Sequence, residues 1–528
     1  MAAPVLLSLR SLGQFTSLTE QVLVTAIAGL LIAVLISLQR RPKFDLDKIP
    51  GPWTRAYPVV GNILECLRPD FHRKLLDWSN QYGGIYRLKF LWQDALVVTD
   101  PGEGAMDKAA LVYAPINRMC TPHGDANLLT SAADDDWKAI RKAVAVSFSM
   151  QNIRKKFPLV LGRINQLIAR LEALGPQASI DVDQAALRVT LDIIGLAGFN
   201  HDYDCVSQDV PAYDHLIRVL PRCFTEVMLR IANPLRGMFP GQHRNGPKGA
   251  AAFKMFQAEM GVLLRELKQR GTPDPDDQDI ATQLCRVLQD HPNIPESRVL
   301  SEIGILFVEG FETTGHTTSW TLFNIASEPG VQAKIAEELD SLGLLAHPGC
   351  QPPRELEWED LKRLPYMIAA TKEAMRMLPV VSVMGRVAGK DMAVGPYKVP
   401  AGTVVGTPLF AIQNSSHNWE KPEEFIPERW LGVPVETYVY DSTTNTSGGK
   451  RGITFMPFSE GPRNCVGQSL AKMEVLTLLA KLLSNFEIEL APEMGGREGV
   501  RSRESTHLTL QTAGTKGIRC HLHPRSRA

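Results

Sequence analysis

The longest uninterrupted apolar stretch of the chain lies near its amino terminus. Residues 22–38 (VLVTAIAGLLIAVLISL) carry no charged side chain, and their 17 positions are at the short end of the length that spans a bilayer. Arg40, Arg41 and Lys43 follow at once, so the positive-inside rule places the rest of the chain in the cytosol. We therefore expect a short luminal segment over residues 1–21 and an uncleaved transmembrane anchor over residues 22–38. A cleaved signal peptide is the alternative, but its apolar core would be shorter and nearer the start.

A proline-rich segment follows the expected anchor. Residues 39–62 contain the basic cluster, then IPGP at 49–52 and PVVGN at 58–62. Proline fixes φ and removes a backbone donor, which gives a stiff and extended connector. We expect residues 39–62 to be a basic, Pro-rich linker that orients one large folded unit, residues 63–528, at the membrane.

Beyond the linker, hydrophobic positions recur mostly with the period of a helix. Helices are expected over residues 135–147, 152–174, 183–198, 250–269, 294–327 and 356–378. Strands are expected as a hairpin over residues 85–91 and 95–98, and again within 391–410 around turns at 395–396 and 401–402. A segment rich in Gly, Pro and basic residues at 233–249 predicts a mobile loop. Helices and strands without regular alternation predict a mainly α fold with small β-sheets, of the α+β class.

The composition of the chain argues against a nucleic-acid-binding protein and against a disulfide-rich protein, but it does not by itself indicate a function. In the 528 residues, Lys+Arg and Asp+Glu each total 57, so no bulk charge attracts nucleic acid and no nucleic-acid partner is expected. The 8 cysteines are scattered without a CxxC pair, which argues against a disulfide framework. The remaining question is whether one of these cysteines has a special neighbourhood.

Cys465 has such a neighbourhood. It lies in FSEGPRNCVG at 458–467 between Gly461 and Gly467, and an apolar helical pattern begins at Leu470. Backbone N–H groups and the positive end of that helix would favour a thiolate. Glycines allow the backbone to approach a flat cofactor and to donate hydrogen bonds to sulfur. The alternative is a buried structural cysteine in a glycine-rich turn.

This segment resembles the haem-binding loop of the cytochromes P450, whose pattern F-x-x-G-x-R-x-C-x-G it matches at every position. The resemblance implies the cytochrome P450 fold, preceded by the transmembrane helix, and makes residues 63–528 the catalytic domain. It also implies haem b (iron-protoporphyrin IX) as the cofactor, with Cys465 as the axial ligand to the iron and Phe458 packed beside it. A thiolate ligand pushes electron density to the iron and favours O–O cleavage.

Three charged residues resemble the structural core of that family. Glu373 and Arg376 lie one helical turn apart, and Arg429 lies in FIPERW at 425–430. The resemblance implies a Glu–Arg–Arg network that braces the segment before Cys465. Because two cations offset the desolvation of Glu373, we interpret the three residues as structural, not catalytic.

A polar sequence, GFETT at 310–314, interrupts an apolar helical pattern. Gly and Thr are poor choices for a helix interior, and threonine hydroxyls that bond back to carbonyls open a helix locally. The segment resembles the oxygen-activation motif of the cytochromes P450. The resemblance implies that Thr313 contacts dioxygen, that Glu312 relays protons and that Gly310 lies against the haem. Taken alone, the same sequence would be a solvated patch on a helix.

Haem propionates require cations, and arginine binds carboxylates through charge-assisted hydrogen bonds. Trp137 and Arg141 match the WxxxR pattern of the family, Arg463 lies two residues before the cysteine, and Arg386 follows the helix that carries Glu373. The resemblance implies that these residues hold the haem propionates.

The resemblance further implies a monooxygenase that inserts one atom of O2 into an organic substrate with electrons from NADPH. The sequence contains no Gly-rich dinucleotide fingerprint, so we expect a separate NADPH–cytochrome P450 reductase, with cytochrome b5 as a further donor. Lys138 and Lys142 are expected to dock this partner. The apolar run VVSVM at 380–384 predicts a small lipophilic substrate. The endoplasmic reticulum membrane is the expected location, and the plastid envelope is the alternative.

Two other functions compete with this interpretation. A haem-thiolate isomerase or dehydratase acts on hydroperoxides without O2 or a reductase, and such relatives often lack the threonine or alter the cysteine loop. Thr313 and the intact loop around Cys465 therefore favour the monooxygenase. A non-enzymatic haem sensor or binding protein would have no use for the proton-relay segment.

Overall fold

The computed structural model describes residues 44–525 except for 53–60, 91–92, 100–113, 133, 176–177, 208–210, 233–234, 244, 271–275, 433–454, 460 and 515–516. The predicted luminal segment and the predicted anchor lie outside the described residues. Within the part that the structure describes, no helix combines the length and the apolar character needed to cross a bilayer.

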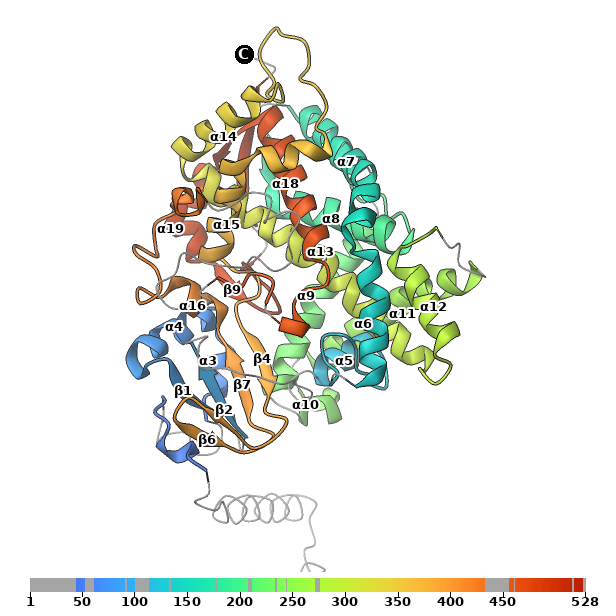
Figure 1. Cartoon of the computed structure of the whole chain (residues 1–528), viewed down its shortest axis with the longest axis vertical. Coiled ribbons are helices and arrows are strands. Elements are labelled where there is room, and N and C mark those ends of the chain that lie inside the picture. Colours follow the sequence, from blue (N-terminus) through green and yellow to red (C-terminus); the bar gives the residue numbers. More distant parts are fainter. Residues whose placement is uncertain are drawn as a thin grey trace, which may run out of the picture.

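Helices make up most of the described chain (Figure 1). The α-helices are α3 (Ile63–Cys66), α4 (Phe71–Tyr82), α5 (Ala114–Cys120), α6 (Asp135–Ser147), α7 (Met150–Ala173), α8 (Val182–Phe199), α9 (Pro211–Ala232), α10 (Leu235–Met238), α11 (Gly246–Gln269), α12 (Ile280–Asp290), α13 (Glu296–Ala326), α14 (Pro329–Ser341), α15 (Pro365–Met377), α16 (Leu409–Asn414), α18 (Gln468–Asn485) and α19 (Gly496–Arg501). Short 3-10 helices are η2 (Leu46–Lys48), η5 (Pro240–Gln242), η6 (Trp358–Arg363), η7 (Pro427–Trp430), η8 (Gly461–Arg463) and η9 (Pro492–Met494).

Within the described residues, strands form four small sheets. The strands are β1 (Ile85–Phe90), β2 (Gln93–Val98), β3 (Ser179–Asp181), β4 (Met384–Val387), β5 (Met392–Val394), β6 (Tyr397–Val399), β7 (Val404–Thr407), β8 (Phe486–Leu490), β9 (Glu504–Thr506), β10 (Leu510–Thr512) and β11 (Arg519–Pro524). The largest sheet has the order β1-β2-β7-β4, in which β2 and β7 are parallel. The others are β3-β11-β8 and the hairpins β5-β6 and β9-β10. The predicted mainly α fold with small sheets is confirmed.

Most of the predicted elements are present with small shifts of their ends. The hairpin β1–β2 is antiparallel as expected, and α6 has the predicted bounds. The helix predicted over 356–378 is divided into η6 and α15, because Pro365 begins a new helix. The mobile loop predicted over 233–249 is wrong in part, since α10, η5 and the start of α11 lie there. Buried Arg236 stabilises α10 by donating hydrogen bonds to Glu226 of α9 at 2.9 and 3.0 Å.

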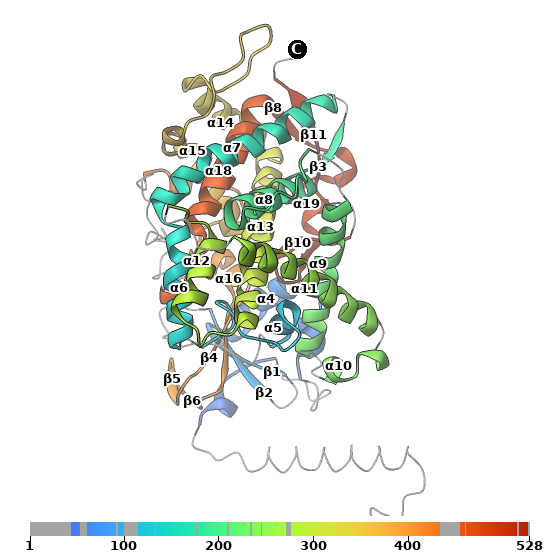
Figure 2. The same ribbon diagram turned by 90° about the vertical axis from the view of Figure 1, so that its right-hand side faces the viewer.

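Helix α13 is the centre of the fold. Its residues belong to both large hydrophobic clusters, one shared with α7, α15 and α18 and the other with α5, α9, α11 and α12. Figures 1 and 2 show this helix inside the body, with α8 alongside it. Glycines allow the close approach of α8, since a Cβ on Gly310 would lie 2.6 Å from Ile194 and one on Gly315 would lie 2.8 Å from Leu187.

The described part of the predicted linker packs on the largest sheet. Ile49 is buried, and Arg87 N of β1 donates to Pro50 O at 2.8 Å. The segment around η2 also pairs with the hairpin β5–β6, where Asp45 N donates to Lys398 O at 2.9 Å. The chain therefore enters the folded body along the edge of this sheet, at the lower end of the molecule in Figure 1.

Candidate active site

The loop that carries Cys465 is a compact turn ahead of α18. Ser459 (φ 62°) and Gly461 (φ 74°) have left-handed backbone conformations that reverse the chain. Cys465 N donates to Phe458 O at 2.9 Å, and Asn464 N donates to Gly461 O at 3.0 Å. These bonds hold the cysteine just before the first turn of α18, as predicted.

Glu309 of α13 shares its surroundings with Cys465. Cys465 is exposed, and so is Glu309, although nearly all its neighbours along α13 are buried. Each side chain keeps accessible surface while protein atoms surround it on most sides. Arg141, half-buried on α6, interacts electrostatically with both groups. The three residues, from three separate elements, therefore lie close enough together to act on one another electrostatically.

Opposing effects act on the protonation of Cys465. Burial raises the pKa of the Cys465 thiol to about 11, and the Glu309 carboxyl raises it further, while the Gly467 N–H, Arg141 and Lys472 lower it. The loop donor at Gly467 therefore acts in the expected direction, and burial together with Glu309 acts against it. A thiolate at neutral pH needs an additional positive charge at the sulfur, which a bound iron ion supplies.

Cationic and aromatic groups gather beside this loop. Arg141 donates to both Asn464 O (2.9 Å) and Asn464 Oδ1 (2.8 Å). The Arg463 guanidinium lies 4.3 Å from the centre of the Trp137 ring and donates to Leu129 O and Ser131 O at 3.2 and 3.0 Å. Trp137 in turn donates from Nε1 to Leu128 O at 3.0 Å. Trp137, Arg141 and Arg463 are thus brought together with Cys465.

Arg386 comes from another part of the fold. It lies half-buried on β4 and donates to Gly385 O of its own strand at 3.2 Å. Met384 of the same strand packs on Met456, which precedes the cysteine loop. The contact of Arg386 with a propionate stays a prediction.

This donor set fits a haem. A sulfur ligand lies at an accessible position, two arginines and a tryptophan are adjacent to it, and the protein groups alone leave the sulfur in need of a cation. Cys465 would hold the iron, and Arg141 and Arg463 are the cations available to anionic groups at the rim of such a cofactor.

The predicted Glu–Arg–Arg cluster is assembled behind the loop. Glu373 and Arg376 have no exposed surface and pair through two hydrogen bonds of 2.9 Å. Arg429 Nε donates to Glu373 Oε1 at 3.2 Å. Two further partners were not predicted: Trp430 Nε1 donates to Glu373 Oε2 at 2.9 Å, and Gln413 O accepts from Arg376 at 2.8 Å.

Gln413 connects this cluster to the cysteine segment. Its Oε1 accepts from Met456 N at 3.0 Å, and Met456 lies nine positions before Cys465. The cluster therefore fixes the backbone that leads into the loop, which agrees with the predicted bracing role.

The polar sequence of α13 does not break the helix. The helical assignment runs without interruption through residues 310–314, although Thr313 Oγ1 donates back to Glu309 O at 2.7 Å as expected. Thr313 is half-buried, whereas Glu312 is buried and accepts from Thr509 Oγ1 at 3.0 Å. Gly310 has a packing role against Ile194 that the sequence did not indicate, and its contact with haem stays a prediction.

Glu309 is a site residue that the sequence analysis missed. Burial raises the pKa of its carboxyl to about 7, with a contribution from Glu302, while Arg141 lowers it. A signal was present, because an acidic residue directly after the apolar run 303–308 is unexpected on a buried helix.

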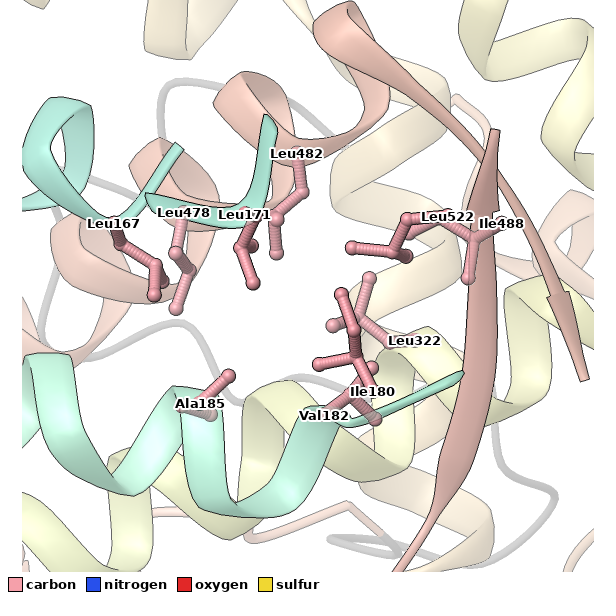
Figure 3. Close-up of a pocket in the computed structure, with 11 residues that line it drawn as sticks. Leu167, Leu171, Ile180, Val182, Ala185, Leu322, Leu478, Leu482, Ile488 and Leu522 are labelled. Carbon is pink, nitrogen blue, oxygen red and sulfur yellow. The ribbon is translucent and has the colours of Figure 1, made fainter. Parts of the chain in front are cut away.

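A separate apolar pocket lies far from this chemistry. It is bounded by α7, α8, α18 and β8, and its lining is aliphatic throughout, including Leu171, Val182, Leu478 and Ile488 (Figure 3). Without a polar, charged or nucleophilic group it has no means of catalysis, so we exclude it as the active site.

Comparison with known proteins agrees with this geometry. The family model for Cytochrome P450 matches residues 50–510. Cytochrome P450 3A6 of Oryctolagus cuniculus is 26% identical over 517 residues, which cover 93% of this chain and 96% of the relative. Carotene epsilon-monooxygenase, chloroplastic, of Arabidopsis thaliana is 27% identical over 470 residues, which cover 83% of this chain and 80% of the relative. Averantin hydroxylase of Dothistroma septosporum is 26% identical over 502 residues, which cover 90% of this chain and 88% of the relative. The chain therefore belongs to the cytochrome P450 family and is a haem-thiolate monooxygenase.

Proposed function

We propose that this protein binds haem b through the Cys465 thiolate and inserts one oxygen atom into a lipophilic substrate, using NADPH-derived electrons from a separate reductase. The observation that carries the proposal is the group formed by Cys465, Arg141, Arg463 and Trp137, which offers a sulfur ligand and cations side by side. The bound haem supplies the oxidising chemistry, and the residues around it position the reactants and deliver protons.

Thr313 and Glu312 are the proposed proton-handling pair. Thr313 is half-buried on α13, with its hydroxyl held at Glu309 O. Glu312, the residue before it, is buried and accepts a hydrogen bond from Thr509 at one of its oxygens. A buried carboxylate and an accessible hydroxyl on one helical turn suit the stepwise transfer of protons into a dry site.

Electrons are proposed to enter from the side of α6. Lys142 is exposed on this helix, and Lys138 is exposed but pairs with Asp135 at 2.8 Å. Lys142 is therefore the better candidate for contact with an acidic reductase or with cytochrome b5, because no ion pair among the described residues offsets its charge. Arg141 lies between these lysines in sequence and connects the same helix to the cysteine loop.

A lipophilic substrate is supported by the half-buried side chains of Val380, Val381 and Val383. Two relatives are named as a carotene monooxygenase and an averantin hydroxylase, which agrees with an organic substrate.

A membrane location is proposed from the amino-terminal sequence and from the surface near α10. Met238 and Phe239 are exposed at 69% and 48%, which is unusual for large apolar side chains on a soluble surface. Helix α10, which ends at Met238, lies at the same end of the molecule as the first described residues (Figures 1 and 2). We propose the endoplasmic reticulum, with the catalytic domain in the cytosol. One relative carries the word chloroplastic in its name, so the plastid envelope is the alternative that a fluorescent fusion would test.

The test of the catalytic function uses the full chain in membranes with NADPH–cytochrome P450 reductase. Compounds from a lipid extract that shift the haem spin state are first selected, then incubated under 18O2. We expect one 18O atom in the product and a strict requirement for NADPH. Conversion of a lipid hydroperoxide without NADPH or O2, and no labelled product, would instead support the isomerase or dehydratase.

A further inference from the structure

A buried histidine connects the proposed relay to a second carboxylate. His316 lies one helical turn after Glu312 on α13 and is 2% exposed. Its Nδ1 lies 2.9 Å from Asp183 Oδ1, and its Nε2 lies 3.6 Å from Glu312 Oε1. Asp183 comes from the first turn of α8, 133 positions away along the chain. One imidazole thus bridges a carboxylate from each of the two central helices.

The electrostatics of this cluster keep the imidazole charged. Burial lowers the pKa of His316, but the Asp183 and Glu312 carboxylates outweigh it and raise that pKa to about 10. Burial also acts to raise the pKa of Asp183, yet the attraction and hydrogen bonds from His316 and Ser319 leave it lowered. A protonated imidazole has two N–H donors, so it suits a position between two acceptors.

The two oxygens of Glu312 have different environments. Oε1 accepts from Thr509 Oγ1 at 3.0 Å and faces His316. Oε2 is buried and has no hydrogen-bond partner among the described residues. Buried carboxylate oxygens are almost always satisfied, so an open one points to a function that needs a free acceptor.

We propose that His316, anchored by Asp183, is a positioning residue that holds Glu312 through Oε1, so that Oε2 stays open to accept and pass on protons. This inference rests on the relay role proposed for Glu312. A lone ionised carboxylate at this depth would be costly, and the imidazolium offsets that cost from the side away from Oε2. His316 itself transfers no proton in this arrangement.

Few titratable groups act on this cluster. Asp183 faces His316 from α8 and is coupled to Asp181 at the start of the same helix. Glu312 faces it from α13. His507, between β9 and β10, acts on Glu312, and burial lowers its pKa. Asp183 is therefore the main anchor of the charge on His316.

The functional test needs no known substrate. With reductase, NADPH and O2 alone, the haem enzyme partitions between two reactions. One NADPH and one H+ reduce O2 to H2O2, and two NADPH and two H+ reduce O2 to two H2O. Only the second breaks the O–O bond, which requires further proton delivery. The ratio of peroxide formed to NADPH consumed therefore reports on the relay.

We expect His316→Gln to slow the water-forming reaction by about tenfold, which raises the peroxide ratio. Asp183→Asn should leave His316 buried without its anchor, so that its pKa falls below its ordinary value of about 6.5. The peroxide ratio of that variant should rise with pH between about 5.5 and 8, where the wild type is flat. His72→Gln is the control, because His72 is an equally buried histidine 3.0 Å from the Glu504 carboxylate.

A second readout does not depend on turnover. In the full chain labelled with 15N-histidine, the signal missing from His316→Gln identifies His316. Both of its ring nitrogens should be protonated from about pH 6 to 9, and they should lose a proton by neutral pH in Asp183→Asn. A neutral His316 at pH 7 in the wild type would overturn the proposal, as would a flat and unchanged peroxide ratio in Asp183→Asn.

The variant Glu312→Gln distinguishes a failure of the positioning role of His316 from a failure of the proton relay proposed for Glu312. If Glu312→Gln raises the peroxide ratio while His316→Gln and Asp183→Asn do not, the positioning role of His316 is wrong and the relay stands. If Glu312→Gln itself leaves the ratio unchanged, the relay proposal falls, and the role of His316 falls with it.

Discussion

Two buried carboxylates, Glu373 and Glu312, occupy comparable positions and differ in how completely they are satisfied. Both lie on interior helices next to a cation. Glu373 accepts hydrogen bonds at both oxygens, from Arg376, Arg429, Trp430 and the backbone of Ile426. Glu312 uses Oε1 only, and its Oε2 has no partner among the described residues.

This difference distinguishes a structural carboxylate, Glu373, from a carboxylate that is proposed to transfer protons, Glu312. A carboxylate whose every acceptor is used holds its neighbours in one arrangement and has no capacity left for chemistry. A carboxylate with one oxygen that lacks a hydrogen-bond partner lowers the stability of the fold, but that oxygen can accept a proton. Removing the first should therefore damage the fold, and removing the second should damage turnover.

Glu373→Gln should have the largest effect. It leaves Arg376 fully buried without its counter-charge, which costs about 3–5 kcal/mol of unfolding free energy. Denaturant unfolding of the full chain would measure it, and loss of bound haem should accompany it. Glu424→Gln is the control, since its exposed pair with Lys421 should contribute less than about 1 kcal/mol. Equal stability of the two variants would contradict the bracing role.

Thr313→Ala should change turnover more than stability. The hydroxyl bonds back to Glu309 O, and its loss should alter the unfolding free energy by less than about 1 kcal/mol. The peroxide released per NADPH should rise several-fold, because the proposed relay loses its accessible hydroxyl. Thr317→Ala removes the same kind of bond one turn later, at 2.7 Å from Thr313 O, and should leave the ratio unchanged. Low peroxide in Thr313→Ala would count against the relay.

Glu309→Gln should show that the Glu309 carboxyl lowers the stability of the folded protein in a pH-dependent way. The pKa of Glu309 is about 7 in the folded protein and 4.5 without the fold, so the unfolded state loses its proton first as pH rises. Stability from this group therefore falls between pH 4.5 and about 7 and stays low above that window. The variant should melt higher than the wild type at pH 8 and about the same near pH 4.5. A melting difference that did not change with pH would refute this assignment.

Charge reversal on α6 should leave stability nearly unchanged. Lys142→Glu should slow reduction by the reductase at low salt, and the deficit should shrink as salt screens the contact. Lys138→Glu should have a smaller effect, since Asp135 already offsets that lysine. Stopped-flow reduction at two ionic strengths measures both. Reduction rates that stay the same in both variants and at both ionic strengths would contradict the docking proposal.

The sequence predicted the elements more completely than the interactions. Local periodicity predicted α6 with its observed bounds, and matched motifs brought Cys465, Arg141 and Arg463 to one site. The pairing of His316 with Asp183 could not be predicted, because no local pattern links positions so far apart along the chain. The effects of burial and of Glu309 on the pKa of Cys465 could not be predicted for a related reason, since both act through the folded arrangement.

The central claim, that Cys465 supplies the sulfur that binds haem iron, has one most direct test. The full chain and its Cys465→His variant are purified, reduced and exposed to CO, and their absorption spectra are compared. We expect the wild type to show the red-shifted CO band typical of thiolate ligation, and the variant to lose it while keeping any haem through nitrogen. The same band in the variant, or no porphyrin in the wild type, would contradict the account.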